Sequence, residues 1–364
     1  MSNIATTDAR PLFTKDLVAV YRQMIEPTGL LRSFFKETYS PTKEVSIEVQ
    51  RGFELVAVDV VRGTEGTRNK FPRSTEKIFV PPLYDEYFDM TELDLYDRMF
   101  GSTQITGSDW ANFVYSGAMK LKQIMDKIDR AAELQCAQVF QTGIVTLKNG
   151  DNIDFKRKAT SIVDPGTGNY WANSGGTSLA PTGTDPYVQL QAGCDFLRKT
   201  GKSVGGRFNL IMGAQALTDL KKNQYFLQRQ NLFNMSLDTV NPPQRDSVGA
   251  TLHGRLTVGN YELTLWGYPQ YYNDPTTGAL TPYISDNTVV MLPDNPEFVL
   301  SYAAVPQLLI DTNGARVTPF QGKFLVNEFP DFRRAKHDVD VKSAFVAIPV
   351  AVDRLWTLKT GAGA

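Results

Sequence analysis

The chain has 364 residues, 42% hydrophobic and 21% charged, which are ordinary values for a folded soluble protein of two or three compact units. Its 38 basic residues face 39 acidic ones, and this balance excludes a generally polycationic nucleic-acid binder while leaving room for a local basic patch. The sequence has no apolar run long enough to span a membrane, no secretory signal pattern and only two cysteines, Cys136 and Cys194. We therefore expect a soluble, cytoplasmic protein without a disulfide framework.

Residues 1–44 predict an N-terminal arm. Two short apolar-periodic pieces, at 17–24 and 30–35, flank the turn-forming sequence Pro27-Thr28-Gly29. A segment of this length buries little surface by itself, so we expect it to pack on the body of the protein or on a neighbouring molecule.

Residues 45–82 predict an extended β-ribbon. Polar and apolar residues alternate over 45–50, β-favouring residues run through 53–60, and a second strand over 74–80 stops at a double proline. Between the strands lies a polar tip at 62–73. An isolated ribbon is only marginally stable in water, so its apolar side chains need a surface, which in a multimer can belong to a neighbouring subunit.

Opposite charges follow one another along this part of the sequence. The tip carries four bases against one acid: Arg62, Arg68, Lys70 and Arg73. Residues 85–98 carry six acids against one base, among them Asp89, Glu92, Asp94 and Asp97. The two blocks could meet within one chain or between chains, or stay as solvated faces, since exposed pairs contribute only about 0–1 kcal/mol.

The clearest element is a long helix over 108–142. This stretch lacks proline, and its apolar residues recur every three or four positions, which indicates an amphipathic helix of roughly 50 Å that ends at Gly143. Because Gln135 interrupts the apolar stripe and only about four heptads fit, we favour a helix packed on a sheet over a coiled coil.

The remainder predicts a mixed α+β pattern without regular βαβ repeats. After polar sequence with short strands at 144–183, Thr184-Asp185-Pro186 marks a helix start and Gly201 its end, with Cys194 in the core stripe. We expect a buried strand at 208–212 and one helix over 214–229. Further strands are expected at 256–258, 261–266, 288–292, 298–302 and 343–352.

Few residues suit catalysis. Only two histidines occur, His253 and His337, and neither has a second ligand at metal-binding spacing, so we expect no metal and no cofactor. Residues 201–205 (GKSVG) match the G-x-S-x-G pattern of hydrolases, but that motif needs a strand before it and a helix after it, whereas a helical pattern precedes it here. A serine hydrolase using Ser203 is kept as an alternative.

Several stretches carry a resemblance to a known family. They are Ser33-Phe34-Phe35 ahead of 43–50 (KEVSIEVQ), 77–84 (KIFVPPLY), 89–95 (DMTELDL), Pro330-Asp331-Phe332 and 341–350 (VKSAFVAIPV). In this order, with an arm, a ribbon, a long helix and a compact α+β region, the chain resembles the major capsid protein of tailed bacteriophages, in particular the lambda-type capsid protein E family, which has the Hong-Kong-ninety-seven type fold.

The resemblance implies a division of the chain and a function. The parts are the N-terminal arm (1–44), the extended β-ribbon loop (45–82), a peripheral domain (83–183) with a spine helix (108–142), an axial domain (184–335), and a closing strand and tail (336–364). The function implied is that of a non-enzymatic subunit that self-assembles through hexamers and pentamers into the icosahedral shell around the double-stranded DNA of a tailed phage. It would be found in the virion and, during assembly, in the host cytoplasm.

The resemblance also implies partners. These are further copies of the chain, a scaffolding protein, a portal protein and packaged double-stranded DNA contacted without sequence specificity, with a decoration protein left open and no membrane. We expect the basic residues of the ribbon tip to contact the acidic residues at 89–97 of a neighbouring copy. A cellular encapsulin-like shell with an enzyme cargo is kept as an alternative.

Overall fold

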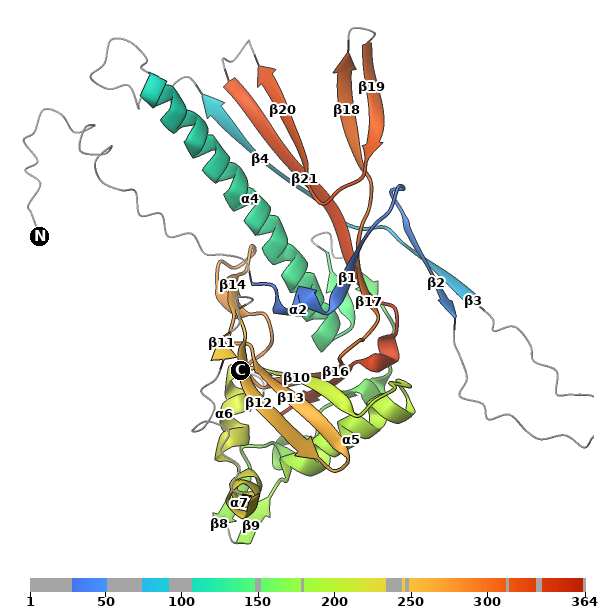
Figure 1. Cartoon of the computed structure of the whole chain (residues 1–364), viewed down its shortest axis with the longest axis vertical. Helices are drawn as coiled ribbons and strands as arrows, with labels where there is room; N and C mark the ends of the chain where they lie inside the picture. The colour runs from blue at the N-terminus through green and yellow to red at the C-terminus, as the bar shows by residue number, and fades with distance from the viewer. Residues whose placement is uncertain are drawn as a thin grey trace, which may run out of the picture.

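A computed structural model of the chain describes residues 28–50, 74–91, 107–147, 152–177, 180–233, 244–245, 249–311, 314–331 and 336–362. The architecture is mixed α+β, as predicted, with one long helix, a five-stranded sheet, a seven-stranded sheet and several two-stranded hairpins. In Figure 1 the long helix and the five-stranded sheet form the upper part of the molecule, and the seven-stranded sheet with its helices forms the lower part.

The five-stranded sheet is built around one long strand, β21. Its strands are β1 (Phe35–Tyr39), β17 (Phe298–Tyr302), β21 (Lys336–Pro349), β20 (Leu325–Asp331) and β4 (Leu83–Thr91). The first half of β21 lies between β4 and β20, and its second half pairs with β17, which pairs in turn with β1. The strand expected at 343–352 is therefore the later part of a longer strand, and β4 and β20 were not predicted.

The spine helix α4 spans Gly107–Gln141 and confirms the long helix predicted at 108–142. It packs on the five-stranded sheet through buried residues such as Ile124 and Ile128, which confirms packing on a sheet. Gln135, within the apolar stripe, is buried because it has partners: its Nε2 donates to the Tyr84 hydroxyl at 2.8 Å and its Oε1 accepts from the Ala347 N–H at 3.2 Å.

The C-terminal end of α4 is held by Gly143 and Arg157. Gly143 has a φ of 73°, and a Cβ at this position would overlap the Arg157 side chain. Arg157 donates to the Phe140 carbonyl at 2.9 Å, at the negative end of the helix dipole, and to the Leu355 carbonyl at 3.3 Å. Burial lowers the pKa of Arg157 to about 10. This guanidinium ties the end of the helix to the segment that leads into β22.

The seven-stranded sheet forms the second core. Its strands, in order, are β11 (Gln244–Arg245), β12 (Thr251–Val258), β13 (Tyr261–Gly267), β10 (Arg207–Met212), β16 (Thr288–Pro293), β22 (Trp356–Lys359) and β7 (Ile162–Val163). Helix α5 (Pro186–Lys199) begins at Asp185, whose carboxylate caps the Tyr187 N–H, and it packs on the sheet through Leu190, Cys194 and Leu197. The predicted helix start and the core position of Cys194 are confirmed.

The prediction of one helix over 214–229 is wrong. Two helices occur, α6 (Ala214–Lys222) and α7 (Gln224–Phe233), because Asn223 between them has an extended ψ of 130°. The Asn223 side chain is fully buried: Nδ2 donates to the carbonyls of Trp171 and Thr184, and Oδ1 accepts from the Tyr225 N–H. Contacts from distant parts of the chain thus break a helix that local sequence would continue.

Short elements complete the fold. They are α2 (Leu30–Ser33), the 3₁₀ turns η1 (Ala159–Ser161), η2 (Thr167–Asn169) and η3 (Val352–Arg354), and the hairpins β2 (Val45–Gln50) with β3 (Ser74–Phe79), β5 (Ile144–Thr146) with β6 (Asn152–Asp154), β8 (Ser174–Thr177) with β9 (Ala180–Gly183), β14 (Tyr271–Asn273) with β15 (Leu280–Pro282), and β18 (Val305–Asp311) with β19 (Gly314–Phe320). The chain passes between the two large sheets more than once, since β17 and β20 join the first and β22 joins the second. The domain boundaries expected from sequence stay a prediction.

Candidate intersubunit surfaces

The β2–β3 ribbon packs on the body of the protein at its described base. Val45 pairs with Phe79, Val45 is buried, and the Phe79 ring lies 5.4 Å from the Phe155 ring. On the opposite face of the ribbon Ser46 pairs with Ile78, which is exposed. Beyond this base the described part of the ribbon points away from the rest of the molecule (Figure 1).

Apolar side chains stay uncovered along the extended segment from β3 into β4. Their exposed fractions are large: Ile78 60%, Val80 51%, Leu83 53% and Tyr87 69%. Side chains alternate between the faces of a strand, so Tyr84 and Phe88 turn toward the core while Leu83 and Tyr87 turn to solvent. Full burial of one such side chain is worth about 1.5–3 kcal/mol, so this segment favours association.

The open face of the five-stranded sheet, turned away from α4, is acidic where β4 and β21 pair. The register sets Asp89 opposite Asp338, Tyr87 opposite Asp340 and Asp85 opposite Lys342. Lys342 lies 3.4 Å from Asp85 and 3.3 Å from Asp340. We call Asp85, Asp89, Asp338 and Asp340 the acidic sheet face.

The charges around Lys342 are strong enough to shift its titration. Partial burial by itself would lower the pKa of Lys342, but the carboxylates of Asp340 and Asp85 outweigh it and raise this pKa above its usual value. The base is thus held within the acidic sheet face, which keeps an excess of carboxylates.

Of the residues predicted for intersubunit contact, Asp89 lies exposed on β4. The others lie outside the described residues: Arg62, Arg68, Lys70, Arg73, Glu92, Asp94 and Asp97. Sequence reasoning missed Asp338 and Asp340, because they come next to Asp89 only through the pairing of strands some 250 residues apart. The local sequence does contain one indication of their position: Asp338 and Asp340 alternate with Val339 and Val341, a pattern typical of a strand with one polar face.

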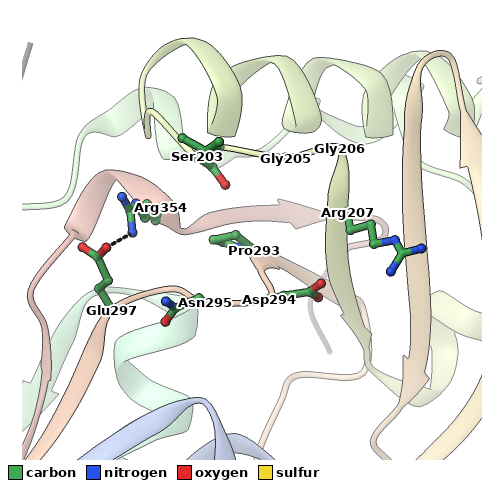
Figure 2. A pocket seen from close by; sticks show the side chains of 10 residues that line it. Ser203, Gly205, Gly206, Arg207, Pro293, Asp294, Asn295, Glu297 and Arg354 are labelled. Atoms are coloured by element: carbon green, nitrogen blue, oxygen red, sulfur yellow. Dashed lines mark ion pairs between the residues drawn. The ribbon is translucent and has the colours of Figure 1, made fainter. Parts of the chain in front are cut away.

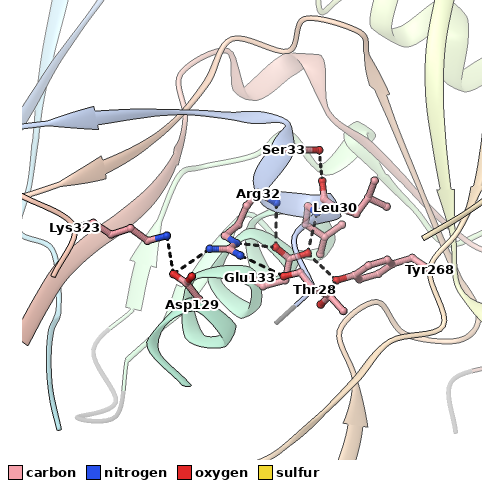
Figure 3. Close-up of polar contacts among 9 residues, drawn as sticks. Thr28, Leu30, Arg32, Ser33, Asp129, Glu133, Tyr268 and Lys323 are labelled. Carbon is pink, nitrogen blue, oxygen red and sulfur yellow. Dashed lines mark hydrogen bonds and ion pairs between the residues drawn. The ribbon is translucent and has the colours of Figure 1, made fainter. Parts of the chain in front are cut away.

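A buried carboxylate anchors the segment where the arm meets the body (Figure 3). Glu133 of α4 accepts hydrogen bonds from the N–H groups of Leu31 and Arg32, at 2.9 Å and 3.1 Å, and from the Tyr268 hydroxyl at 2.7 Å. The Arg32 guanidinium lies 3.4 Å from Glu133 and 3.1 Å from Asp129. Glu133 therefore joins three parts of the fold: the arm segment, the spine helix and the end of β13.

The environment of Glu133 also perturbs its titration. Burial raises the pKa of this carboxyl above its usual value, although Tyr268, the two backbone N–H groups and Arg32 all oppose the shift. The anchor extends on the surface side to Lys323, whose ammonium lies 2.9 Å from Asp129.

Ser203 lines an open pocket of 520 Å³ between the α5–β10 loop, the β16–β17 loop and η3 (Figure 2). Helix α5 precedes Ser203 and strand β10 follows it, the reverse of a hydrolase elbow. None of the 10 lining residues is a histidine. The carboxylate of Glu297 is paired with Arg354 at 2.8 Å, and that of Asp294 accepts from Asn209 at 2.8 Å. The order of elements around Ser203 therefore does not match the hydrolase alternative.

Within the residues that the structure describes, no group of three or more His, Cys, Asp or Glu side chains is arranged to hold a metal ion. No helix in the same ranges is long and apolar enough to cross a membrane.

Comparison with known proteins gives one family match. The family model of the phage major capsid protein E matches residues 13–358. No curated protein matches the chain in sequence.

Solved structures resemble the chain at low sequence identity. A protein described as a prophage capsid protein from Escherichia coli is 15% identical with a TM-score of 0.59, covering 92% of this chain and 93% of that one. A phage-related protein of Bordetella bronchiseptica is 13% identical with a TM-score of 0.48, covering 96% and 95%. An encapsulin of Synechococcus elongatus is 11% identical with a TM-score of 0.42, covering 96% and 95%.

Proposed function

The chain belongs to the phage major capsid protein E family, and from that premise we propose how its copies join and what they enclose. It is a structural subunit of a phage capsid and a component of the virion. We propose an icosahedral shell of hexamers and pentamers around double-stranded DNA, built without any catalytic step, and assembled in the host cytoplasm.

The observation that carries the proposed assembly is the uncovered ribbon. A two-stranded ribbon is marginal in water, yet β2–β3 leaves the body with Ile78 and Val80 exposed, and β4 continues with Leu83 and Tyr87 exposed. In a closed shell, heterologous contacts repeat around rotations that close, so each copy can cover the ribbon of the next. Many such contacts, each modest, sum to a stable shell.

Charge would fix where the ribbon of one copy sits on the next. The tip sequence carries Arg62, Arg68, Lys70 and Arg73, and the acidic sheet face offers Asp85, Asp89, Asp338 and Asp340. Glu92, Asp94 and Asp97 follow Asp89 in sequence and would extend that surface. Complementary charge of this kind sets the register of an interface and disfavours wrong neighbours more than it adds affinity.

The division of the chain is also part of the proposal. Residues 1–44 act as the arm, 45–82 as the extended loop, and α4 with the five-stranded sheet as the peripheral layer. The seven-stranded sheet, with α5 to α7, would meet its copies at the five-fold and six-fold axes. The chain crosses between the two sheets from β16 to β17 and again from β21 to β22, whereas β20 and β21, on either side of the proposed boundary at 335 and 336, pair with each other in the first sheet.

Further partners follow from the same function. A scaffolding protein is proposed as a separate chain that guides assembly. A portal protein at one vertex and DNA contacted without sequence specificity complete the set. A cargo enzyme, as in an encapsulin-like shell, has no supporting observation here, since the family model is that of a phage capsid protein.

Charge reversal at the ribbon tip tests the contact. The variant Arg68→Glu, Lys70→Glu, Arg73→Glu should give a folded subunit by circular dichroism but few shells by electron microscopy. A control reverses three other cations whose side chains are mostly exposed: Lys156→Glu, Lys199→Glu and Arg207→Glu. Adding Asp89→Lys and Asp338→Lys to the tip variant should restore shells, because both sides of the contact then change sign. Normal shell yield from the tip variant would refute the contact.

A further inference from the structure

We propose that residues 17–24 of the N-terminal arm pack on the outer face of the β14–β15 hairpin of the same chain. The inference goes beyond the proposed function, because it concerns one subunit and holds before any shell forms. It assigns an occupant to an apolar surface that the described part of the chain leaves uncovered.

The β14–β15 hairpin has an inner face toward the core and an outer face toward solvent. Among the described strands, β14 and β15 pair only with each other, and Tyr271 lies opposite Pro282. Tyr272 is on the inner face, where its ring centroid lies 5.0 Å from that of Tyr283. Because neighbouring side chains alternate, Tyr271 and Leu280 lie on the outer face, 42% and 67% exposed. We call Tyr271, Leu280 and Pro282 the hairpin face.

This hairpin has little to stabilise its outer side. A two-stranded hairpin is marginal in water, and β14 and β15 are only three residues each. A large aromatic ring and a leucine side by side on such a short element gain stability when another apolar segment covers them. The hairpin face is therefore a suitable surface for a short amphipathic segment.

The arm enters the described structure at the foot of this hairpin (Figure 3). The first described residue is Thr28, and its Oγ1 accepts from the Tyr268 hydroxyl at 2.8 Å. Thr28 also lies against Gly249, where an added Cβ would come within 2.6 Å of the Thr28 methyl group. Tyr271 follows Tyr268 by only three residues, which span about 11 Å of chain at most. Thr28 is thus held within a short distance of the hairpin face.

Residues 17–24 have the pattern that such a surface needs. Apolar residues stand at positions i, i+3, i+4 and i+7, the spacing of one face of an amphipathic helix: Leu17, Val20, Tyr21 and Met24. A helix this short is marginal in water by itself, so the segment gains stability only on a surface. Met24 is four residues from Thr28, so at most about 14 Å of chain joins the segment to its anchored end.

The short connection favours the hairpin face of the same chain over that of another copy. A short linker that can span two sites gives an effective concentration on the order of millimolar, so contact within the chain wins at the low concentration of free subunits. The docked arm would cover the hairpin face before assembly, while the ribbon with its exposed Ile78 and Val80 stays available to a neighbouring copy.

Disulfide trapping in the full-length, unassembled subunit tests the contact. The variant Tyr21→Cys, Leu280→Cys should form an intrachain disulfide under mild oxidation, identified by peptide mass spectrometry. Both native cysteines are fully buried and should not compete. The control Tyr21→Cys, Val188→Cys places the second thiol at an equally exposed apolar position on α5, 65% exposed, and its disulfide should form at least several-fold more slowly.

Hydroxyl-radical footprinting gives a second measurement that needs no particular disulfide geometry. The variant Leu17→Ser, Val20→Ser, Tyr21→Ser removes the apolar stripe of the arm but leaves the hairpin unchanged. Oxidation of Leu280 should be several-fold faster in this variant than in wild type, because the side chain loses its cover. Oxidation of Val188 should be the same in both proteins.

The outcomes separate the possible occupants of the hairpin face. An equal Leu280 oxidation rate in wild type and in the arm variant would overturn the docking, whatever the disulfide rates. Disulfides that form mainly between chains would also overturn it, in favour of an arm exchanged between copies. Leu280 protection that appears only after a scaffold is added would assign the surface to the scaffold. None of these measurements requires a shell, so a failure to form shells would bear on the proposed function alone.

Discussion

Removal of the Glu133 carboxylate should loosen the arm segment and destabilise the subunit strongly. In the native state this side chain is fully buried and accepts three hydrogen bonds, from the backbone N–H groups of Leu31 and Arg32 and from the Tyr268 hydroxyl. Glu133→Ala removes the acceptor of the two backbone N–H groups, leaves the Tyr268 hydroxyl with Thr28 Oγ1 as its acceptor, and leaves Arg32 with Asp129 and the Thr28 carbonyl as partners. Breaking a buried ion pair by removing one partner typically costs about 3–5 kcal/mol, and we expect a loss in this range.

Glu133→Gln keeps the size and shape of the side chain but removes its negative charge, so it tests the contribution of the charge alone. The amide oxygen can still accept from one or two donors, but the amide nitrogen now faces a donor, so about 1–3 kcal/mol should be lost. Urea unfolding of the unassembled subunit measures both variants, and hydrogen exchange of the Leu31 and Arg32 amides reports whether the loss is local to the arm segment. A Glu133→Ala variant within about 0.5 kcal/mol of wild type would show that the carboxylate does not anchor the arm.

The difference in unfolding free energy between wild type and Glu133→Gln should change with pH in a defined direction. Burial raises the pKa of Glu133 above its usual value of 4.5, so the native state binds this proton more tightly than the unfolded state. The part of the unfolding free energy that depends on protonation of Glu133 is therefore fully present below pH 4.5 and is lost as the pH rises through the native pKa, while the hydrogen bonds to the carboxylate remain. The unfolding free energies of wild type and Glu133→Gln should come closer together as the pH rises from 4.5 through the native pKa of Glu133. A gap that widens with pH would contradict the raised pKa.

Two further substitutions test other parts of the fold. Gly143→Ala should cost about 2 kcal/mol or more by urea unfolding, because Gly143 has a φ of 73° and the new Cβ meets Arg157, whereas Gly168→Ala, with open space at its Cβ, should stay within about 0.5 kcal/mol. Equal effects of the two would refute the role of Gly143. Tyr87→Ser should barely change subunit stability, since the ring is 69% exposed, but should raise the concentration needed for shell formation by about tenfold, measured by light scattering. An unchanged concentration would remove Tyr87 from the interface.

Local sequence was sufficient where an element is long or carries its own boundary signals. Helix α4 was predicted within one residue at each end because its apolar period and Gly143 are both local features. Helix α5 was predicted from Asp185 and Pro186, a capping residue and a proline that act on the first turn directly. The resemblance to phage capsid proteins likewise depended on the order of such elements, and the family match confirmed it.

Tertiary structure decided what depends on partners distant in sequence. Strand β4 was not predicted because its sequence was interpreted as a charged stretch. Its strand character follows from pairing with β21, which lies far away in sequence. Asn223 breaks a helix only because the carbonyls of Trp171 and Thr184 come close enough to accept from its amide.

The candidate surfaces divide in the same way. Composition and residue period, which are properties of each segment alone, establish a basic ribbon tip, an acidic stretch after it and more apolar strand than a ribbon can bury. Folding alone brings Asp338 and Asp340 next to Asp85 and Asp89 on one face, and sets this face across the sheet from α4. Strand register and helix packing set these neighbours, and both result from long-range contacts that no local pattern encodes.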